Sequence, residues 1–218
     1  MNDGRRARRP EDKDQRRRQL TDTARVVFDE GTPFAALTMA AVATRAGLAK
    51  GTSYLYFPTK EALFLEVLRE DLDGWFAALG AAISALPACD ASPEALAEAL
   101  TETLLACPRL LRLLAMLHAV LEANLDRESA LQFKTFLASR LSQTDTMLHP
   151  RFPGFQEGDV ARLLLRTHAL VVGLEGMASP SAVVVDVLET PDLRWLKVDL
   201  RTELVATVSA LLRGWQRR

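Results

Sequence analysis

The chain has 218 residues, 49% of them apolar and 25% charged, which is typical of a protein with one large or two small domains and a substantial core. No apolar run reaches the roughly 18 residues that a membrane-spanning helix needs. The arginine-rich start lacks the apolar segment of a secretory signal. Two cysteines, Cys89 and Cys107, are too few for a disulfide framework. These features predict a cytoplasmic protein without a membrane partner.

Charge is distributed unevenly along the chain, although the net charge is only −1. Residues 1–60 carry 12 Lys and Arg against 7 Asp and Glu, whereas residues 61–218 carry 15 against 21. A basic N-terminal part indicates a polyanionic partner, and a basic tail that only aids solubility is the alternative. Residues 1–13 predict a disordered basic arm that either contacts DNA or stays in solvent. Its cations include Arg5, Arg6, Arg8 and Arg9.

The first predicted helix runs from Asp14 to Glu30, because apolar residues recur on one face and Gly31 and Pro33 follow. Thr38 is suited to cap a second, short helix over residues 39–46. A turn containing glycine then leads into a third helix. A short helix, a glycine turn and another short helix form the helix-turn-helix pattern.

The third helix is predicted to end near Tyr54, before Pro58, and Thr59 is suited to cap a long fourth helix. The segment 180–191 contains AVVVDVL, which fits a short extended piece as well as a helical turn. The sequence therefore predicts an all-α chain with a three-helix helix-turn-helix domain over 14–60 and a helical domain over 61–218. Further helices are predicted over 93–106, 108–125, 128–148 and 157–178, with the last from Leu193 or Leu196 to Arg213.

Residues 16–64 resemble the N-terminal DNA-binding domain of the tetracycline-repressor (TetR) family of bacterial transcription regulators. The resemblance is carried by Ala24–Phe28 with Gly31 and by LTMAAVATRAGLAKGTSYLYFPTKEALF. This stretch has the family's Thr before helix two, Ala-Gly turn, Lys-Gly-Thr start of the recognition helix, Tyr-x-Tyr-Phe ending and Lys-Glu opening of helix four. The chain departs from the pattern at Ala49, where many relatives have a capping Ser.

A recognition helix in the major groove needs small residues close to the bases, with hydroxyls and cations around them for the phosphates. Thr52 is suited to a base edge, and Lys50 to guanine or phosphate. In the alternative reading the tyrosines close the three-helix core and Lys60 is a solvated charge. The predicted DNA contacts are Thr38, Arg45, Lys50, Gly51, Thr52, Ser53, Tyr54, Tyr56 and Lys60.

One recognition helix reads only a few base pairs, so we expect a homodimer. The resemblance implies that the last two long helices form a four-helix bundle with the partner, and the alternative is that both belong to the core of one chain. The predicted dimer residues are Leu170, Gly173, Leu204, Val208, Leu211 and Trp215.

The resemblance also implies an inducer site among the middle helices, where an apolar pocket with a few polar groups is expected. A histidine on such a helix is more often a core residue with satisfied hydrogen bonds than a ligand contact. The predicted ligand residues are Trp75, Met116, His118, Glu122, Asn124, Phe133, His168 and Glu175.

Together these patterns predict a repressor that binds a palindromic operator as a dimer and is released by a small apolar or aromatic ligand. The alternative is a dimeric DNA-binding regulator controlled by protein contact or abundance, without a small-molecule ligand. No catalytic residues, cofactor or metal site are predicted. Three histidines and two cysteines lack metal-ligand spacing, and no GxSxG, P-loop or GxGxxG motif occurs.

Overall fold

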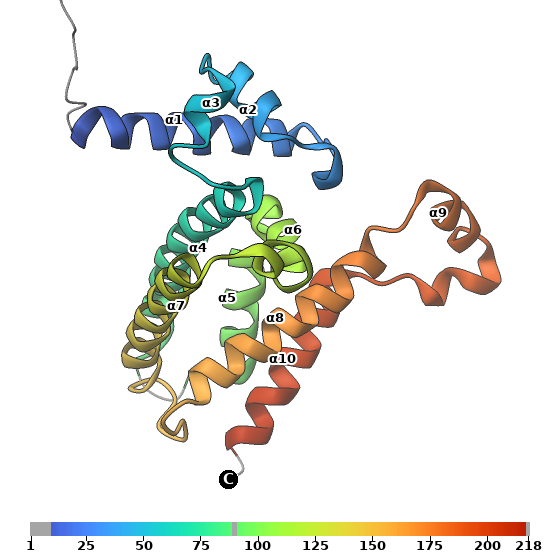
Figure 1. Cartoon of the computed structure of the whole chain (residues 1–218). Helices are drawn as coiled ribbons and strands as arrows, with labels where there is room; N and C mark the ends of the chain where they lie inside the picture. The colour runs from blue at the N-terminus through green and yellow to red at the C-terminus, as the bar shows by residue number, and fades with distance from the viewer. Residues whose placement is uncertain (1–9, 89–90, 217–218) are drawn as a thin grey trace, which may run out of the picture.

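The computed structural model describes residues 10–88 and 91–216, which form helices and turns with no strand among them (Figure 1). The predicted all-α fold is confirmed. The basic arm of residues 1–9 and the thiol of Cys89 lie outside the described residues. The helices are α1 (Pro10–Asp29), α2 (Met39–Arg45), α3 (Lys50–Ser53), α4 (Lys60–Ala85), α5 (Pro93–Leu105), α6 (Pro108–Met116), α7 (Arg127–Leu148), α8 (Asp159–Ala178), α9 (Ala182–Leu188) and α10 (Leu200–Gln216).

The helices α1, α2 and α3 form an N-terminal unit at one end of the molecule (Figure 1). Residues 10–13, which the sequence assigned to the arm, form the first turn of α1. Gly31 and Gly47 adopt φ angles of 84° and 66°, a left-handed conformation that favours glycine and so ends α1 and α2. The Thr38 hydroxyl accepts a hydrogen bond from the Ala41 N–H at 3.1 Å, which confirms it as the cap of α2.

The long helix α4 joins the N-terminal unit to the C-terminal domain. Thr59 caps it as predicted by accepting from the Ala62 N–H at 3.0 Å. Near its start, the Phe64 ring packs against Phe28 and Phe34, with ring centroids 5.5 and 5.2 Å apart. Further along, Trp75 and other apolar residues of α4 enter the core of the C-terminal domain. A displacement of α4 therefore moves both parts of the chain.

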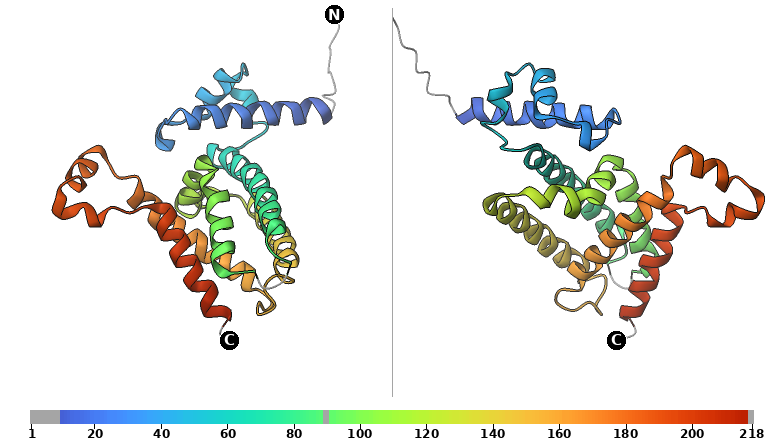
Figure 2. Two further views of the ribbon diagram at one scale, coloured as in Figure 1. Left: turned by 180° about the vertical axis from the view of Figure 1, so that it is seen from behind. Right: turned by 45° about the vertical axis from the view of Figure 1, so that its right-hand side comes forward.

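The C-terminal domain packs α4 to α8 and α10 around one apolar core (Figure 2). The single helix predicted over 108–125 is instead α6, a π-helical turn over Leu117–Leu121 (η2) and a 3₁₀ turn over Glu122–Asn124. The last helix begins at Leu200, later than predicted. Asp199 precedes it and accepts a hydrogen bond from the Thr202 N–H at 2.8 Å, in the manner of a helix cap.

The segment between α8 and α10 projects away from the rest of the chain (Figures 1 and 2). AVVVDVL within it, for which the sequence left two conformations open, forms the helix α9. A 3₁₀ helix over Pro191–Leu196 (η4) follows and packs against α9.

Candidate nucleic-acid interface and ligand pocket

The outer surface of α3 presents small and cationic groups to solvent. Lys50 and Gly51 are exposed, Thr52 is half-buried, and the Tyr54 side chain that follows is 46% exposed. Within residues 10–88 and 91–216, no hydrogen bond or ion pair engages the Lys50 ammonium. Ala49 precedes α3 without a side-chain cap, as the sequence indicated. Four of the predicted DNA contacts therefore lie on or next to one exposed surface.

Two of the predicted contacts face the interior instead. Ser53 is fully buried, and its hydroxyl donates to the Lys50 carbonyl oxygen at 2.7 Å. Tyr56 is buried in the same core cluster as Phe57. Ser53 and Tyr56 pack the inner side of α3 against the rest of the N-terminal unit. A helix this short is not stable by itself and depends on such packing.

Lys60 is also engaged within the chain. Its ammonium donates to the carbonyl oxygens of Phe34 at 2.9 Å and Leu37 at 3.1 Å, and lies 4.6 Å from the centre of the Phe34 ring. It therefore holds the connection between α1 and α2 against the start of α4. A phosphate contact by Lys60 would require breaking these bonds, so we remove it from the proposed DNA contacts.

Arg45 and Thr38 lie at the two ends of α2. Arg45 forms an exposed ion pair with Glu30, with 2.5 Å between Nη1 and Oε2, and the Glu30 hydrogen bond and charge raise its pKa. Exposed ion pairs of this kind contribute little to stability. Arg45 can therefore exchange the carboxylate for a phosphate at small cost. Thr38 is exposed at the start of α2.

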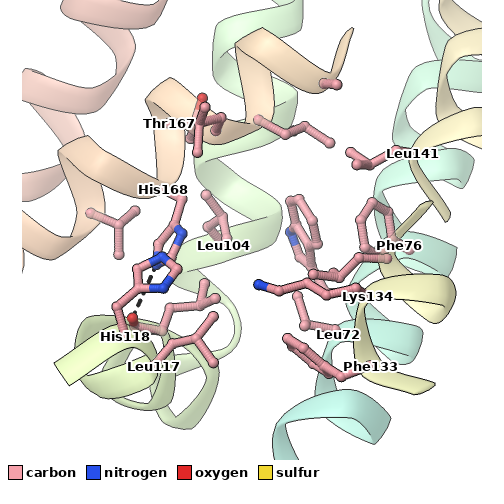
Figure 3. A pocket seen from close by; sticks show the side chains of 17 residues that line it. Leu72, Phe76, Leu104, Leu117, His118, Phe133, Lys134, Leu141, Thr167 and His168 are labelled. Carbon is pink, nitrogen blue, oxygen red and sulfur yellow. Dashed lines mark hydrogen bonds between the residues drawn. The ribbon is translucent and has the colours of Figure 1, made fainter. Parts of the chain in front are cut away.

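A cavity of about 190 Å³ lies within the C-terminal domain, between α4, α7, α8 and the turn η2 (Figure 3). The cavity is lined by four of the residues predicted to contact a ligand, Trp75, His118, Phe133 and His168. Met116 and Glu175 do not line it, and the Asn124 side chain lies outside the described residues. The sequence did not identify the other lining residues, which are Leu72, Phe76, Leu104, Leu114, Leu117, Lys134, Leu137, Leu141, Ala161, Leu164, Leu165, Thr167 and Val171.

Figure 3 shows the rings of His118 and His168 together at one side of this otherwise apolar cavity, with the Lys134 side chain extending toward them from the opposite side. Glu122 does not line the cavity, but its carboxylate accepts from Lys134 Nζ at 2.6 Å and lies 2.8 Å from His118 Nδ1. Burial raises the pKa of Glu122, but these two hydrogen bonds outweigh it and the pKa is lowered. The carboxylate therefore stays ionised and holds both side chains at the cavity.

His168 packs against His118, with ring centroids 5.2 Å apart. Its Nε2 lies 3.0 Å from the Leu114 carbonyl oxygen, so the Nε2–H tautomer donates to that oxygen. Burial lowers the pKa of His168, which keeps the ring neutral near pH 7. The bond joins α8 to the end of α6.

A network of ion pairs joins α6 to α1 and α4. Arg109 donates to the Asp71 carboxylate at 2.7 and 3.0 Å and also pairs with Asp29. Arg112 donates to the same Asp29 carboxylate at 3.0 Å, and its guanidinium lies 4.5 Å from the centre of the Phe28 ring. The hydrogen bonds and charges of Asp71 and, after it, Asp29 raise the pKa of Arg109. The helix that carries Leu114 into the cavity is thus bonded to the end of α1.

The predicted dimer surface needs a correction. Leu204, Val208 and Trp215 are buried in the core of their own chain, where α10 packs against α5 and α8. They are therefore unavailable to a second copy. Of the remaining predicted residues, Gly173 is exposed and Leu170 and Leu211 are half-buried. The outward faces of α8 and α10 instead expose Leu165, Ala169, Val172, Gly173, Gly176 and Met177, and Ala206, Ala210 and Gly214.

A helix-turn-helix unit joined by one long helix to a larger helical domain is the architecture of a class of DNA-binding regulators. Residues 20–67 match the family described as bacterial regulatory proteins, tetR family, and residues 69–218 match the tetracyclin repressor-like C-terminal domain. The chain therefore belongs to the TetR family and is a DNA-binding transcriptional regulator. Comparison with curated proteins gives no match.

Two solved structures have a similar fold. The fatty acid degradation regulator FadR from Bacillus halodurans is 20% identical, with a TM-score of 0.57, and the match covers 91% of this chain and 94% of that one. A possible TetR family transcriptional regulator from Streptomyces coelicolor A3(2) is 22% identical, with a TM-score of 0.54, over 91% and 97% of the two chains. At these identities the likeness shows the fold alone.

The ionisable side chains of the described residues do not gather into a metal site. No group of three or more His, Cys, Asp or Glu side chains there is arranged to hold a metal ion. No single described helix is both long and apolar enough to cross a bilayer, and two sharply bent helix pairs reach the required length and hydropathy only jointly.

Proposed function

We propose that this protein is a homodimeric repressor that binds a palindromic operator through α2 and α3 and is released by a small apolar ligand in the cavity of the C-terminal domain. The observation that carries the DNA-binding part is the exposed Lys50 ammonium, which pairs with no group of the described residues, beside Gly51, Thr52 and Tyr54. This surface combines an unpaired cation, hydroxyl groups and a glycine at which the backbone can come close to the bases. A helix that binds in the major groove requires these features.

The proposed contacts divide into two kinds. Thr52 and Gly51 lie where a helix meets base edges, so they contribute to sequence preference. Lys50, Tyr54, Arg45 and Thr38 supply cations and hydroxyls for base or phosphate contacts around them. Phosphate contacts fix the register of the protein on the duplex without reading its sequence. Lys60, Ser53 and Tyr56 hold the unit together and are not proposed as contacts.

The ligand that suits the cavity has an apolar or aromatic body and one polar end. Leucines and the rings of Trp75, Phe76 and Phe133 surround the body. At the polar end, the Lys134 ammonium offers hydrogen-bond donors, and the His118 Nε2 offers an acceptor when its Nδ1–H donates to Glu122. Binding sites of this kind are mostly apolar, with a few polar groups that fix orientation. The protein of similar fold from Bacillus halodurans is a fatty acid degradation regulator. Fatty acids also have an apolar body and one polar end.

Release from DNA would follow from a shift between two arrangements of the N-terminal units. A ligand that displaces Leu114 or His168 moves α6, and Arg109 and Arg112 pass that movement to Asp29 of α1. The ligand can weaken DNA binding only by the difference in its affinity for the two arrangements. A coupling of about 1–3 kcal/mol, typical of such systems, changes operator affinity by about 5- to 150-fold.

In vitro selection of duplexes bound by the full-length protein tests the proposal. We expect enrichment of an inverted repeat, with half-site centres one or two helical turns apart. Titration of the selected duplex in the presence of a panel of apolar and aromatic acids should then identify compounds that lower its affinity. Recovery of no enriched sequence, or of binding insensitive to salt, would contradict the assignment of α3 as a recognition helix.

A further inference from the structure

The segment 180–198, which we name the α9 arm, exposes more large apolar side chains than a free surface segment usually does. It contains α9 and η4 and projects from the body of the chain (Figures 1 and 2). Trp195 is 78% exposed and Val183 is 74% exposed. Four more apolar side chains of the arm are also exposed, namely Val184, Val185, Val187 and Leu196.

The α9 arm contains few interactions that would stabilise its folded conformation. α9 has seven residues, fewer than the roughly 12–15 that an isolated helix needs for even marginal stability in water. Its main packing partner is η4, which belongs to the same arm. The polar contacts within the arm, such as Lys197 to Glu189 at 2.5 Å, are exposed. Burial of the apolar side chains against another surface would supply the missing stabilisation.

We propose that the α9 arm docks on a second copy of this chain and forms part of the dimer interface. The arm leaves the body at the end of α8 and returns at the start of α10. These are the two helices whose outward faces carry exposed apolar and small residues. Met177, in the last turn of α8, continues that surface toward the arm. This inference rests on the dimer of the proposed function.

The charge of the arm argues against an anionic membrane or a nucleic acid as its partner. Asp186, Glu189 and Asp192 outnumber Arg194 and Lys197. Helices that bind anionic membranes carry lysine and arginine on their polar face, and segments that bind nucleic acid are basic. A slightly acidic, valine-rich arm suits an apolar protein surface instead. In a second copy, the exposed Leu165 and Val172 of α8 offer such a surface.

Tryptophan fluorescence of the full-length protein gives a direct test. Of the three tryptophans, Trp75 and Trp215 are buried within the chain, so a change in solvent exposure belongs to Trp195. The Trp195→Phe variant, subtracted from the wild type, isolates its emission. We expect blue-shifted emission and protection from acrylamide at concentrations where sedimentation shows a dimer, and loss of both on dilution to the monomer.

The same pair of measurements separates this inference from the proposed function. A dimer in which acrylamide quenches Trp195 freely would overturn the docking of the arm and leave the dimer intact. A protein that stays monomeric at every concentration would overturn both. Protection of Trp195 in the monomer would also overturn the inference, because the arm would then be covered by its own chain.

A second variant does not depend on fluorescence. Val183 and Val187 lie one turn apart on α9, and Val183→Asp with Val187→Asp places two charges on one face. We expect the dimer dissociation constant to rise about tenfold or more. Leu131→Asp is the matched control, since Leu131 is an exposed apolar residue of α7 and belongs neither to the arm nor to α8 or α10. Equal dimerisation by both variants would overturn the proposal.

Discussion

Two lysines of the helix-turn-helix unit, Lys50 and Lys60, carry the same charge in opposite surroundings. Lys50 is exposed and pairs with no group of the described residues, whereas the Lys60 ammonium donates to two backbone carbonyl oxygens. A free cation next to a DNA groove either neutralises a phosphate, which releases counterions from the DNA, or forms a hydrogen bond to a guanine. A cation that is bonded within the chain stabilises the fold. The two residues should therefore respond differently to the same substitution.

We predict that Lys50→Ala weakens binding to operator DNA. If Lys50 neutralises a phosphate, the variant also lowers the slope of log affinity against log salt by about 0.9 for each phosphate that is no longer neutralised. Fluorescence anisotropy at several KCl concentrations measures both quantities. An unchanged affinity for operator and random duplexes alike would remove Lys50 from the interface.

For Lys60→Ala we predict a loss of stability. The free energy of unfolding should fall by about 1–3 kcal/mol, since two carbonyl oxygens lose a charged donor. Urea denaturation at fixed protein concentration measures this loss. The salt slope of DNA binding by the folded variant should match that of the wild type. A reduced salt slope with full stability would instead restore Lys60 to the DNA contacts.

Stability should also depend on His168, whose pKa is lowered in the folded chain. Below its ordinary pKa of about 6.5, the unfolded chain binds a proton that the folded chain binds less readily, so the free energy of unfolding decreases as pH falls from about 6.5 toward the lowered folded value. Above about 6.5 the contribution is constant. Glu122, Lys134 and His118 face the same ring and act on its charge.

We predict that His168→Gln flattens this part of the stability profile, as measured by urea unfolding between about pH 5 and 7.5. The substitution retains a donor for the Leu114 carbonyl oxygen while removing the titrating group. His149→Gln serves as the control, because His149 is exposed. An identical pH dependence in wild type and His168→Gln would show that this histidine does not contribute.

The sequence indicated cavity-lining residues where residue type alone carried the information. Among the residues that line the cavity, it singled out Trp75, His118, Phe133 and His168, because aromatic and ionisable side chains are conspicuous among leucines and alanines. Lys134 and the lining leucines were missed, because a leucine facing a cavity has the same pattern as one facing the core. Ser53 was expected on the DNA-facing surface but is buried. In a helix of one turn, the sequence pattern does not show which small polar residues face solvent and which face the core.

At the scale of elements, α6, like α4, contacts both the cavity and the N-terminal unit. Its Arg112 bonds to Asp29 at the end of α1, and its Leu114 accepts the hydrogen bond of His168. The π-helical turn that follows places His118 at the cavity, and such turns are frequent at functional sites. No feature of the sequence distinguished this turn from a continuous helix, because the apolar pattern runs through it without a proline or glycine.

We predict that Arg112→Ala reduces the coupling between ligand and DNA. The factor by which an inducing compound weakens operator affinity should decrease, because α6 loses one of its bonds to α1. Anisotropy titrations with and without the compound measure the factor. Arg201→Ala, which removes an exposed ion pair between α10 and Glu102 of α5, is the control. A coupling that is equal in both variants would indicate that another element carries the signal.

At the scale of the whole molecule, the sequence assigned the dimer surface to the last two long helices but did not distinguish their outward faces from their buried ones. Leu204, Val208 and Trp215 repeat at helical spacing, and this pattern fits a core within one chain as well as a surface between two chains. Only the packing of α10 on α5 decides between them. The faces left outward carry Gly173 and small residues, which allow two helices to approach closely.

The glycine at position 173 allows a prediction in which stability and assembly change in opposite directions. A Cβ atom added there meets no atom within 4 Å in the single chain, and glycine costs about 1 kcal/mol relative to alanine inside a helix. Gly173→Gln should therefore stabilise the monomer while its side chain blocks the approach of a second copy. We expect a higher free energy of unfolding at low protein concentration, a weaker dimer by sedimentation equilibrium, and a lower operator affinity.

Gly74→Gln is the control, because Gly74 lies in α4 with equally open space and should stabilise the helix without changing the dimer. A Gly173→Gln variant that dimerises as tightly as the control would exclude this face of α8 from the interface.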